Sequence, residues 1–569
     1  MGNYSDAHIC QCLSRLMTLR RNSTVMINVA AAEEGDCRKT GVQFAEGVLR
    51  LADGLLQLGL KPGHVVAIAA LNSDSYLEWL LAVTYAGGIA APFNYRWSLQ
   101  EARLAMNEVK PMMLVTDKTH DYWHFKLQTD LRWHVSMTAP KLSSSHGDVL
   151  TTELLKSSSL NSARLLCAPN NAALLCFTSG TSGRPKGVML SHSALIVQSL
   201  AKLALVGYSE DDIYLHTSPL CHIGGISSAL AMLMVGGCHV FIPKFEVKSA
   251  IRVIEQHHVT SFITVPAMMA DLISSARTTQ TTKNFETVNK ILNGAGGLLP
   301  GLLEGAVKVF PRAKLISAYG MTEACSSLTF MTLYDPTIGS YNQHRQMIDS
   351  KTSDSVQQFA GVCVGKPAPH VELRISSNGS PQVGKILTRG PHVMLGYWGQ
   401  IPSKSSSPAD EGWFDTGDIG QTDECGNLWL IGRNGSRIKS GGENIYPEEV
   451  EAVILQHPGI SRVIVVGLPD SRLTEMVVAC IRLKDNWQWD EFNPCNDKDH
   501  CLSKEILQQF CKDKNLTGFK IPRNFMLWRT PFPMTTTGKL RRDEVKKEAM
   551  SRWVNENVFS SGVLLSSNL

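Results

Sequence analysis

Residues 178–187 read Thr178-Ser179-Gly180-Thr181-Ser182-Gly183-Arg184-Pro185-Lys186-Gly187. The strand-like run Ala173 to Phe177 precedes this stretch, and a pattern typical of a helix follows it. Its glycines let backbone N–H groups approach an anion, its hydroxyls can donate to phosphate oxygens, and Lys186 adds a positive charge. We therefore predict a phosphate-binding loop, against the alternative of a flexible Ser/Gly turn. It is not a Walker loop, because Pro185 stands where that motif needs its second glycine.

Apolar strand-like runs alternate with helical patterns on both sides of this loop. The strand-like runs include His64 to Leu71, Met113 to Thr116 and Ser261 to Val265, and the helical patterns include Tyr76 to Ala86 and Val247 to His257. Such alternation favours an α/β fold with helix-covered sheets. After Asp418 the pattern changes to short strands and turns, which predicts a domain boundary near residue 434.

Length and charge limit the classes of partner. The chain has 569 residues, enough for several domains or one large enzyme. Its 55 Lys and Arg exceed its 51 Asp and Glu by only 4, too few for a dedicated nucleic-acid binder. No apolar run reaches the ~18 to 20 residues that a membrane span requires. We therefore expect a small-molecule partner, with no nucleic acid and no membrane span, while the oligomeric state is not encoded in any recognisable pattern.

A second motif, Ser317-Ala318-Tyr319-Gly320-Met321-Thr322-Glu323, ends another apolar run. The ring of Tyr319 could stack on a purine, and Thr322 and Glu323 offer hard oxygens to a magnesium ion that accompanies phosphates. Downstream, Asp418 could accept both ribose hydroxyl protons, and Arg433 supplies a cation for the same nucleotide. A local turn for Asp418 and a surface ion pair for Arg433 are the alternatives.

A glycine turn runs into a helix at residues 438–451, which include Lys439, Gly441 and Gly442. Pro447 stands near the start of the expected helix, and acids occupy its first turn. We see no structural need for two glycines, so we expect a ligand to approach the backbone here.

The last motif is Pro533-Met534-Thr535-Thr536-Thr537-Gly538-Lys539-Leu540-Arg541-Arg542, in which a lysine lies on a hydroxyl-rich turn. A lone lysine of this kind is usually solvated. In this order, however, the motifs together resemble the adenylate-forming superfamily of acyl-CoA synthetases, aryl-CoA ligases, firefly luciferases and peptide-synthetase adenylation domains. The resemblance runs from about Thr40 to Arg542. It implies a large N-terminal multi-subdomain α/β domain, residues 1–434, which binds ATP and the acid, and a small mobile α+β C-terminal domain, residues 435–569.

The resemblance also implies an ATP-dependent acid–thiol ligase with ATP, Mg²⁺ and coenzyme A as co-substrates. A carboxylate attacks the α-phosphorus of ATP to give acyl-AMP and pyrophosphate, and the CoA thiol then displaces AMP. Lys539 would bridge the carboxylate and the α-phosphate, Thr181 and Glu323 would hold Mg²⁺, and His222 would be the gate between acyl and thiol sites. The nucleotide and CoA positions expected are Thr178, Ser179, Gly180, Thr181, Ser182, Gly183, Lys186, Gly294, Gly296, Tyr319, Gly320, Thr322, Asp418, Arg433, Lys439, Gly441 and Gly442.

Family members turn the small domain between the two steps. This withdraws the face that carries Lys539 and presents the Gly441-Gly442 turn to the pantetheine arm of CoA. The pivot lies two residues after the ribose arginine, which is Gly435 in this chain. A glycine can absorb large φ/ψ changes at little cost, so we expect the hinge near 435.

Further phrases resemble plant members that activate an aromatic keto acid with two carboxylates. They include Asn94 to Leu99, His216 to Leu220, Ile263 to Met269 and Gly441 to Glu451. The carboxylate that is not activated needs a polar or cationic anchor. Bacterial members place a basic residue nine positions after the gate histidine, where this chain has Ala231. We expect Ser227 and Ser228 as hydroxyl substitutes, beside His222 and Gly296 in the acyl site, although small residues could simply pack helix on sheet.

Two other functions remain open from the sequence. An aryl- or fatty-acyl-CoA ligase with a monocarboxylate substrate, such as 4-coumarate, would use the same mechanism. A non-catalytic nucleotide-binding protein would show eroded catalytic positions, whereas Lys539, Glu323 and Asp418 are present.

Both ends carry possible targeting signals. Ser567-Asn568-Leu569 resembles a peroxisomal import tripeptide, and Arg15, Arg20 and Arg21 suggest a transit segment. We expect a chloroplast location, a peroxisomal location, or both.

Overall fold

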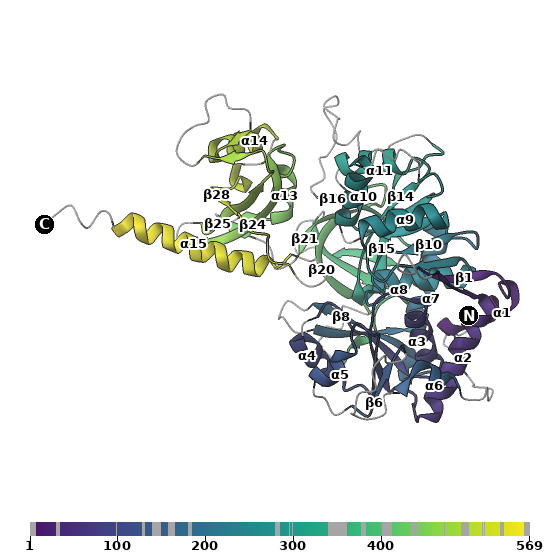
Figure 1. The fold of residues 1–569 in the computed structure, drawn as a ribbon. Helices are drawn as coiled ribbons and strands as arrows, with labels where there is room; N and C mark the ends of the chain where they lie inside the picture. The colour runs from purple at the N-terminus through teal and green to yellow at the C-terminus, as the bar shows by residue number, and fades with distance from the viewer. Residues whose placement is uncertain are drawn as a thin grey trace. The chain divides into compact units, whose positions relative to one another are not determined.

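The computed structural model divides the chain into two compact units. The first comprises Met1–Val356, Val364–Leu373 and Thr388–Phe414, and the second comprises Gln357–Cys363, Arg374–Leu387 and Asp415–Leu569 (Figure 1). The residues described are 7–562 except 30–34, 98, 128–130, 139–149, 158–164, 180–184, 279–284, 295, 299, 339–360, 377–382, 401–411, 434–437, 441–442, 471–472, 491–499, 515, 517 and 535–539. The longest segment of the second unit begins at Asp415. The domain boundary predicted near residue 434 falls at residues outside the described ones and stays a prediction.

The first unit contains an eight-stranded sheet, here called the first sheet, in the order β19-β9-β8-β4-β3-β5-β6-β7. Its strands are β3 (Val65–Ala69), β4 (Ile89–Pro92), β5 (Met113–Thr116), β6 (Trp133–Ser136), β7 (Leu150–Thr151), β8 (Ala172–Ser179), β9 (Pro185–Ser191) and β19 (Gly396–Tyr397). Strands β3 to β8 pair in parallel, and their helices are α2 (Gly41–Gln57), α3 (Asp74–Tyr85), α4 (Leu99–Val109), α5 (Tyr122–Leu127) and α6 (Thr152–Lys156). The α/β prediction is confirmed, and the strand predicted at Met113 to Thr116 has those bounds.

The helix predicted after the phosphate loop is present, but a strand comes before it. Residues Pro185–Ser191 form β9, which pairs antiparallel with β8, and α7 (His192–Val206) starts only afterwards. Val188 and Leu190 are buried in this strand, and the hydroxyl of Ser191 caps α7 by accepting from the backbone N–H of Ala194. The predicted loop therefore lies between two paired strands, β8 and β9.

The same unit contains strands in the order β15-β14-β13-β12-β10-β11-β1-β2, here called the second sheet. They are β1 (Thr24–Asn28), β2 (Cys37–Thr40), β10 (Ile213–His216), β11 (Cys238–Phe241), β12 (Ser261–Thr264), β13 (Lys290–Asn293), β14 (Lys314–Met321) and β15 (Ser326–Tyr334). The remaining helices are α1 (Cys12–Leu19), α8 (Ile223–Val235), α9 (Val247–His257), α10 (Pro266–Thr278), α11 (Pro300–Val309) and the short 3-10 helix η4 (Thr322–Ala324).

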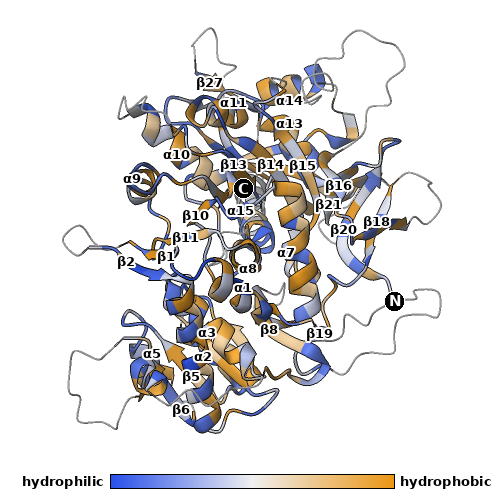
Figure 2. Cartoon of the chain, turned by 90° about the vertical axis from the view of Figure 1, so that its right-hand side faces the viewer, coloured by the Kyte–Doolittle hydropathy of each residue, from blue (hydrophilic) through white to orange (hydrophobic). Residues whose placement is uncertain are grey.

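Helix α8 contributes to two cores. Its Ile226 and Leu230 belong to the cluster of the first sheet, and its Ala231 and Met232 belong to the cluster of the second sheet. The helix is hydrophobic around its circumference (Figure 2), as expected for a helix covered on all sides. Any polar side chain of α8 is therefore held deep inside the unit.

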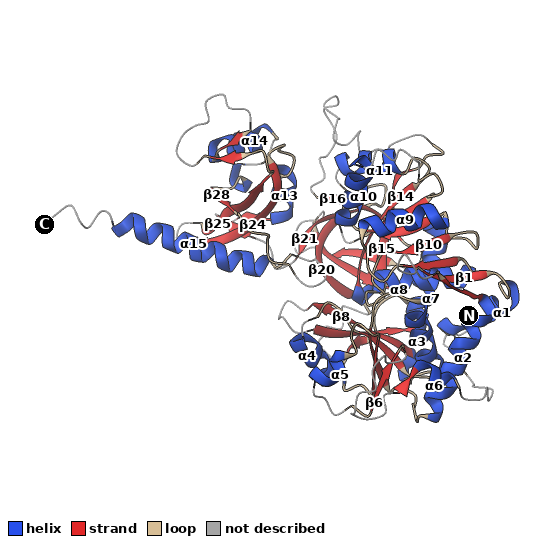
Figure 3. Ribbon diagram, in the orientation of Figure 1, coloured by secondary structure: helices blue, strands red, loops and turns tan. Residues whose placement is uncertain are grey.

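The second unit carries β17 (Glu372–Ser376), β18 (Gly384–Arg389), β20 (Phe414–Thr422) and β21 (Leu428–Arg433), adjacent in that order. A further sheet has the order β23-β22-β25-β24, with β28 beside β25 (Figure 3). Its elements are β22 (Ile438–Ser440), β23 (Glu443–Ile445), α13 (Pro447–Ile454), β24 (Ile460–Asp470), β25 (Thr474–Leu483), α14 (Lys504–Asp513), β28 (Asn524–Leu527) and α15 (Arg542–Gly562). In the part of the chain that is described, no helix has the length and apolar character for crossing a membrane.

Candidate active site

The phosphate loop predicted from the sequence joins two paired strands. Thr178 lies opposite Lys186, and Ser179 lies opposite Pro185, in the β8–β9 hairpin. Directly opposite residues share a face of a sheet, so the Thr178 hydroxyl and the Lys186 ammonium lie on the same side. Gly180, Thr181, Ser182 and Gly183 lie outside the described residues. The hairpin therefore holds one hydroxyl and one cation together at the base of the loop.

Tyr397 connects this hairpin to Glu323. The Lys186 ammonium lies 5.4 Å from the centroid of the Tyr397 ring, and the Tyr397 hydroxyl donates to Glu323 Oε1 at 2.9 Å. Burial and the neighbouring Glu323 carboxylate raise the pKa of Tyr397, which keeps the phenol protonated as a donor. Tyr397 was not predicted from the sequence. The adjacent aromatic residue Trp398 is the one feature that marks this position.

Backbone hydrogen bonds fix the segment around Tyr397 on two sides. Trp398 N donates to Gly187 O at 2.8 Å, and Met394 N donates to Glu323 O at 2.9 Å. Tyr397 also lies opposite Val188 in the β9–β19 pairing. The cation of the hairpin and the carboxylate of η4 thus keep a fixed separation.

Glu323 is 9% exposed. A magnesium ion bound to substrate phosphates keeps several waters and needs only one or two protein carboxylates. The described residues contain no group of three or more His, Cys, Asp or Glu side chains that could hold a metal. In that part of the chain, no metal site is therefore made of protein ligands alone. The donor set around Glu323 fits a metal held largely by phosphate oxygens.

The turn after Glu323 is strained. Cys325 and Ser326 have φ of 54° and 113°, which non-glycine residues rarely adopt. A Cβ on Gly320 would lie 1.6 Å from the Ser326 carbonyl oxygen, so Gly320 is required by its own fold. This close approach accounts for a glycine at position 320 without any ligand, although Gly320 was predicted to bind the nucleotide.

Gly294 behaves differently, although it belongs to the same predicted site. It follows β13, and a Cβ built on it would meet no atom within 4 Å. A Cβ on Gly296 would meet Pro266 Cγ at 3.2 Å, and the Gly296 carbonyl accepts from Asn293 Nδ2 at 2.6 Å. The protein itself therefore leaves open space beside Gly294.

His222 stands at the N-cap of α8 and is half-buried. The turn before it is held by buried Asn72, whose Nδ2 donates to Ser218 O at 3.1 Å and whose Oδ1 accepts from Leu220 N at 2.8 Å. Asn72 was missed from the sequence because it lies 150 positions before His222, and nothing local marks it. It makes the gate turn a fixed feature.

Ser227 and Ser228 are fully buried on α8. Both hydroxyls accept from the ammonium of Lys202 on α7, at 2.5 Å and 3.0 Å. Lys202 was also missed, and its sequence signal is a lysine within the apolar run of residues 200–206. Ala231 is buried among Tyr208 and Tyr214.

The predicted ribose residues lie in the second unit. Asp418 is 3% exposed and lies opposite Arg433 in the β20–β21 pairing. The local turn that was the alternative reading of Asp418 is formed by Asp415. Its Oδ1 accepts from Gly417 N at 2.8 Å, and Gly417 has a φ of 75°. The backbone N–H of Asp418 donates to Thr416 Oγ1 at 3.2 Å.

The C-terminal motifs lie at strand connections. Ser440 lies opposite Glu443, and Lys439 opposite Asn444, so β22 and β23 flank Gly441 and Gly442 directly. A two-residue connection between paired strands favours glycine. The fold therefore gives a reason for the two glycines that was not apparent from the sequence. Met534 and Leu540 form a bridge on either side of the Lys539 turn. Gly441, Gly442 and Lys539 themselves lie outside the described residues.

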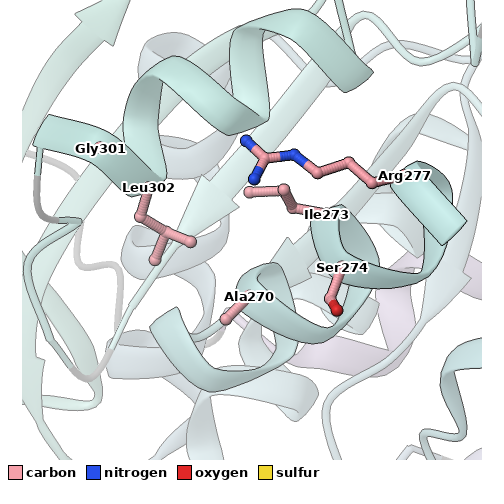
Figure 4. Close-up of a pocket in the computed structure, with 6 residues that line it drawn as sticks. All are labelled: Ala270, Ile273, Ser274, Arg277, Gly301 and Leu302. Carbon is pink, nitrogen blue, oxygen red and sulfur yellow. The ribbon is translucent and has the colours of Figure 1, made fainter. Parts of the chain in front are cut away.

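The structure thus brings together Thr178, Lys186 and Glu323 through Tyr397, and His222 with the two serines on α8. Tyr319 and Thr322 are half-buried on β14 and η4 in the same unit. A pocket of about 520 Å³ lies elsewhere, between α10 and α11 (Figure 4). Its lining is Ala270, Ile273, Ser274, Arg277, Gly301 and Leu302, none of which the motifs predicted.

Known proteins match this chain over nearly its whole length. Residues 19–398 match the family model described as AMP-binding enzyme, and residues 449–539 match the AMP-binding enzyme C-terminal domain. The 2-succinylbenzoate–CoA ligase, chloroplastic/peroxisomal, of Arabidopsis thaliana is 54% identical over 568 residues, 97% of this chain and 99% of that protein. The indoleacetate–CoA ligase of Aromatoleum aromaticum is 30% identical over 89% of this chain and 92% of that protein.

A solved structure has the same fold. The o-succinylbenzoate CoA synthetase (MenE) of Bacillus subtilis, in complex with the acyl-adenylate intermediate OSB-AMP, superposes with a TM-score of 0.73. It is 25% identical, and the match covers 95% of this chain and 98% of that one.

Proposed function

Because this chain belongs to the AMP-binding enzyme family, we propose that it forms 2-succinylbenzoyl-CoA from 2-succinylbenzoate, ATP and CoA through an acyl-adenylate. The adenylate-forming fold expected from the sequence is confirmed, since both family models match. The observation that carries the proposal is the 54% identity to the Arabidopsis ligase over 97% of the chain. We propose that the product serves phylloquinone synthesis, which fits the name of this relative.

The first half-reaction joins two anions. An oxygen of the substrate carboxylate bonds to the α-phosphorus of ATP while the bond from that phosphorus to the bridging oxygen breaks, and pyrophosphate leaves. Because both reactants are negative, positioning and charge neutralisation supply the catalysis. Lys186, at the base of the loop, would compensate phosphate charge, and Lys539 would compensate charge at the reacting oxygen.

ATP, Mg²⁺ and CoA are the co-substrates of this reaction. When bound, the magnesium ion neutralises phosphate charge, and Thr181 and Glu323 would hold it. Tyr397 donates to one oxygen of Glu323 and so fixes the orientation of the carboxylate. Asp418, buried on β20, would accept from the ribose hydroxyls.

In the second half-reaction the CoA sulfur bonds to the acyl carbon. The bond from that carbon to the phosphate oxygen breaks, AMP leaves, and the thiol proton is released. The chain forms no covalent bond to the acyl group. His222, at the start of α8, would separate the acyl site from the path of the thiol.

A pyrophosphate-release screen tests the substrate. We expect kcat/KM for 2-succinylbenzoate to exceed the values for 4-coumarate, benzoate and medium-chain acids by about 100-fold or more, since a buried polar site rejects substrates that leave it unpaired. A preference for indoleacetate or another monocarboxylate would instead support the alternative ligase. Absence of exchange between labelled pyrophosphate and ATP with every acid would support the non-catalytic alternative.

We also propose a chloroplast location, a peroxisomal location, or both, as the name of the Arabidopsis relative states for that protein. Ser567-Asn568-Leu569 lies outside the described residues, and Arg15 is part of α1, whose Leu13 and Leu16 are buried in the core. Fluorescent tags on each end in turn would test the two signals, because a tag masks the signal that it covers. Unchanged distribution with either tag would contradict both.

A further inference from the structure

Lys202 is a fully buried cation without an anionic partner in the described part of the chain. Its side chain has no exposed surface, and its ammonium donates to Ser227 Oγ and Ser228 Oγ. No Asp or Glu carboxylate among the described residues lies within ion-pair distance of it. Burial lowers the pKa of Lys202 to about 7. An ammonium in such a place is costly unless an anion joins it.

The groups around Lys202 do not supply that anion. Burial raises the pKa of the Tyr208 and Tyr214 phenols and of the Cys325 thiol, so all three are neutral at ordinary pH. Gln198, one turn earlier on α7, uses its Nε2 on the backbone carbonyls of Ala324 and Ser327, at 3.0 Å and 2.7 Å. Gln198 thus holds the strained turn, which leaves Lys202 with hydroxyl acceptors only.

A chain of hydroxyls leads from Lys202 toward the gate. Ser227 Oγ lies 3.0 Å from Ser326 Oγ and 3.4 Å from Gly224 O. Ser326 and Gly224 are only half-buried, and a Cβ on Gly224 would meet a single neighbour, Ile263 Cδ1 at 3.8 Å. His222 stands two residues before Gly224. The polar path therefore runs from the space beside Gly224 to the buried ammonium.

Resting on the proposed function, we propose that Lys202, with Ser227 and Ser228, binds the carboxylate of 2-succinylbenzoate that is not activated. The cation lies on α7, whereas its two hydroxyl partners lie on the neighbouring helix α8. Ser227 and Ser228 lie one turn before the buried Ala231, so this part of α8 receives its positive charge from α7. The two serines thus assist a cation and do not replace one.

Three acids test the proposal with the purified full-length protein. Besides 2-succinylbenzoate, they are 4-oxo-4-phenylbutanoate, which lacks the ring carboxylate, and 2-butanoylbenzoate, which lacks the chain carboxylate. The monocarboxylate that the wild type activates identifies the reacting carboxylate. We expect Lys202→Met to lower kcat/KM for 2-succinylbenzoate about 100-fold, mainly through KM, and to lower kcat/KM for that monocarboxylate by at most about threefold.

Gln198→Met is the matched control, because it removes a buried polar group one turn away on the same helix. It should change both substrates by the same factor. If Lys202→Met also changes both equally while its melting temperature shows a folded protein, Lys202 has a structural role and the proposal is overturned. If the wild type does not activate 2-succinylbenzoate but activates another acid, the proposed function itself is overturned.

A measurement on the wild type decides the matter where Lys202→Met does not fold. Because burial lowers the pKa of Lys202, part of its population is neutral at pH 8, and a bound carboxylate should draw a proton onto that part. Burial raises the pKa of Tyr208, Tyr214 and Cys325, so these groups stay protonated there. Calorimetric titration in two buffers of different ionisation enthalpy measures that proton. We expect proton uptake with 2-succinylbenzoate and none with the monocarboxylate. Equal uptake with both acids, or none with either, overturns the proposal.

Discussion

At the scale of single residues, a hydrogen bond from the Tyr397 hydroxyl orients the Glu323 carboxylate. The phenol donates to one carboxylate oxygen and also lies under the Lys186 ammonium. We expect Tyr397→Phe to keep the ring and lose the donor. Groups that orient a metal-binding carboxylate typically contribute 10–100-fold, so acyl-AMP formation should fall by about that factor.

The Mg²⁺ dependence of pyrophosphate release measures this effect. The concentration of Mg²⁺ at half-maximal rate should rise in Tyr397→Phe, while thiolysis of supplied acyl-AMP is unchanged. An unaltered Mg²⁺ dependence would mean that the hydrogen bond holds only the fold of the 394–398 segment.

Two glycines of the predicted nucleotide site give opposite predictions. Gly320→Ala places a methyl group against the Ser326 carbonyl, so we expect a loss of more than about 3 kcal/mol in the free energy of unfolding. Gly294→Ala meets nothing, so its stability should change by less than about 1 kcal/mol. If the backbone at Gly294 faces a ligand, the KM for ATP or the acid must nevertheless rise. Denaturant unfolding together with KM values would separate the two cases, and a fully active Gly294→Ala would remove Gly294 from the site.

At the scale of elements, β10 and β11 carry a buried histidine stack. His216 and His239 are fully buried, with Nε2 and Nδ1 3.0 Å apart, and Phe241 stacks on His216 at 4.3 Å between centroids. Burial lowers the pKa of His239 to about 3 and the pKa of His216 well below 6.5. Below pH 6.5 the unfolded chain binds protons that the folded chain does not, so stability falls as pH falls.

Each buried histidine should therefore cost about 2 kcal/mol of unfolding free energy at pH 5 relative to pH 8. We expect His239→Leu to be less stable than the wild type at pH 8 and to lose less stability on going to pH 5. Urea unfolding at the two pH values measures the difference. His258→Asn is the control, because His258 is exposed at the left-handed end of α9, a position that Asn tolerates. A His239→Leu protein with the wild-type pH dependence would contradict the assignment.

Local periodicity explains which elements could be predicted. The strand at Met113–Thr116 and the helix at Val247–His257 have the predicted bounds, because each has its own buried face. Strand β9 was not predicted, because its pairing with β8 is not visible in a window of residues 185–191. The roles of Tyr397, Asn72 and Lys202 were not predicted for the same reason, since each forms hydrogen bonds with residues 25 to 148 positions away. Motifs mark the loops that are proposed to bind ligands, whereas the residues that support those loops come from distant strands and helices.

At the scale of the whole molecule, the proposed reaction needs two sets of residues in turn. We propose Lys539 for the adenylation set and the Gly441-Gly442 turn for the thiolysis set. We expect Lys539→Ala to lower acyl-AMP formation by about three orders of magnitude, as for loss of a cation that acts in the transition state. Thiolysis of supplied acyl-AMP should survive within a few fold, and Gly441→Trp should show the reverse bias. Single-turnover assays of each half separate the effects, and matching losses in both halves would refute the division of roles.

The proposed pivot at Gly435, between the adenylation set and the thiolysis set, can also be tested. Gly435 follows Arg433, the partner of Asp418 in the β20–β21 pairing, so a rotation there would leave the proposed ribose site in place while turning the residues after it. Proline fixes φ near −65° and stiffens the residue before it, which restricts such a rotation. We therefore expect Gly435→Pro to slow thioester formation at least about tenfold more than adenylation, because in the proposed cycle the rotation is required only after acyl-AMP has formed. Gly435→Ala, which keeps most of the backbone freedom, is the control and should affect both halves by less than about threefold. Equal losses in the two half-reactions of Gly435→Pro would place the pivot elsewhere in the chain.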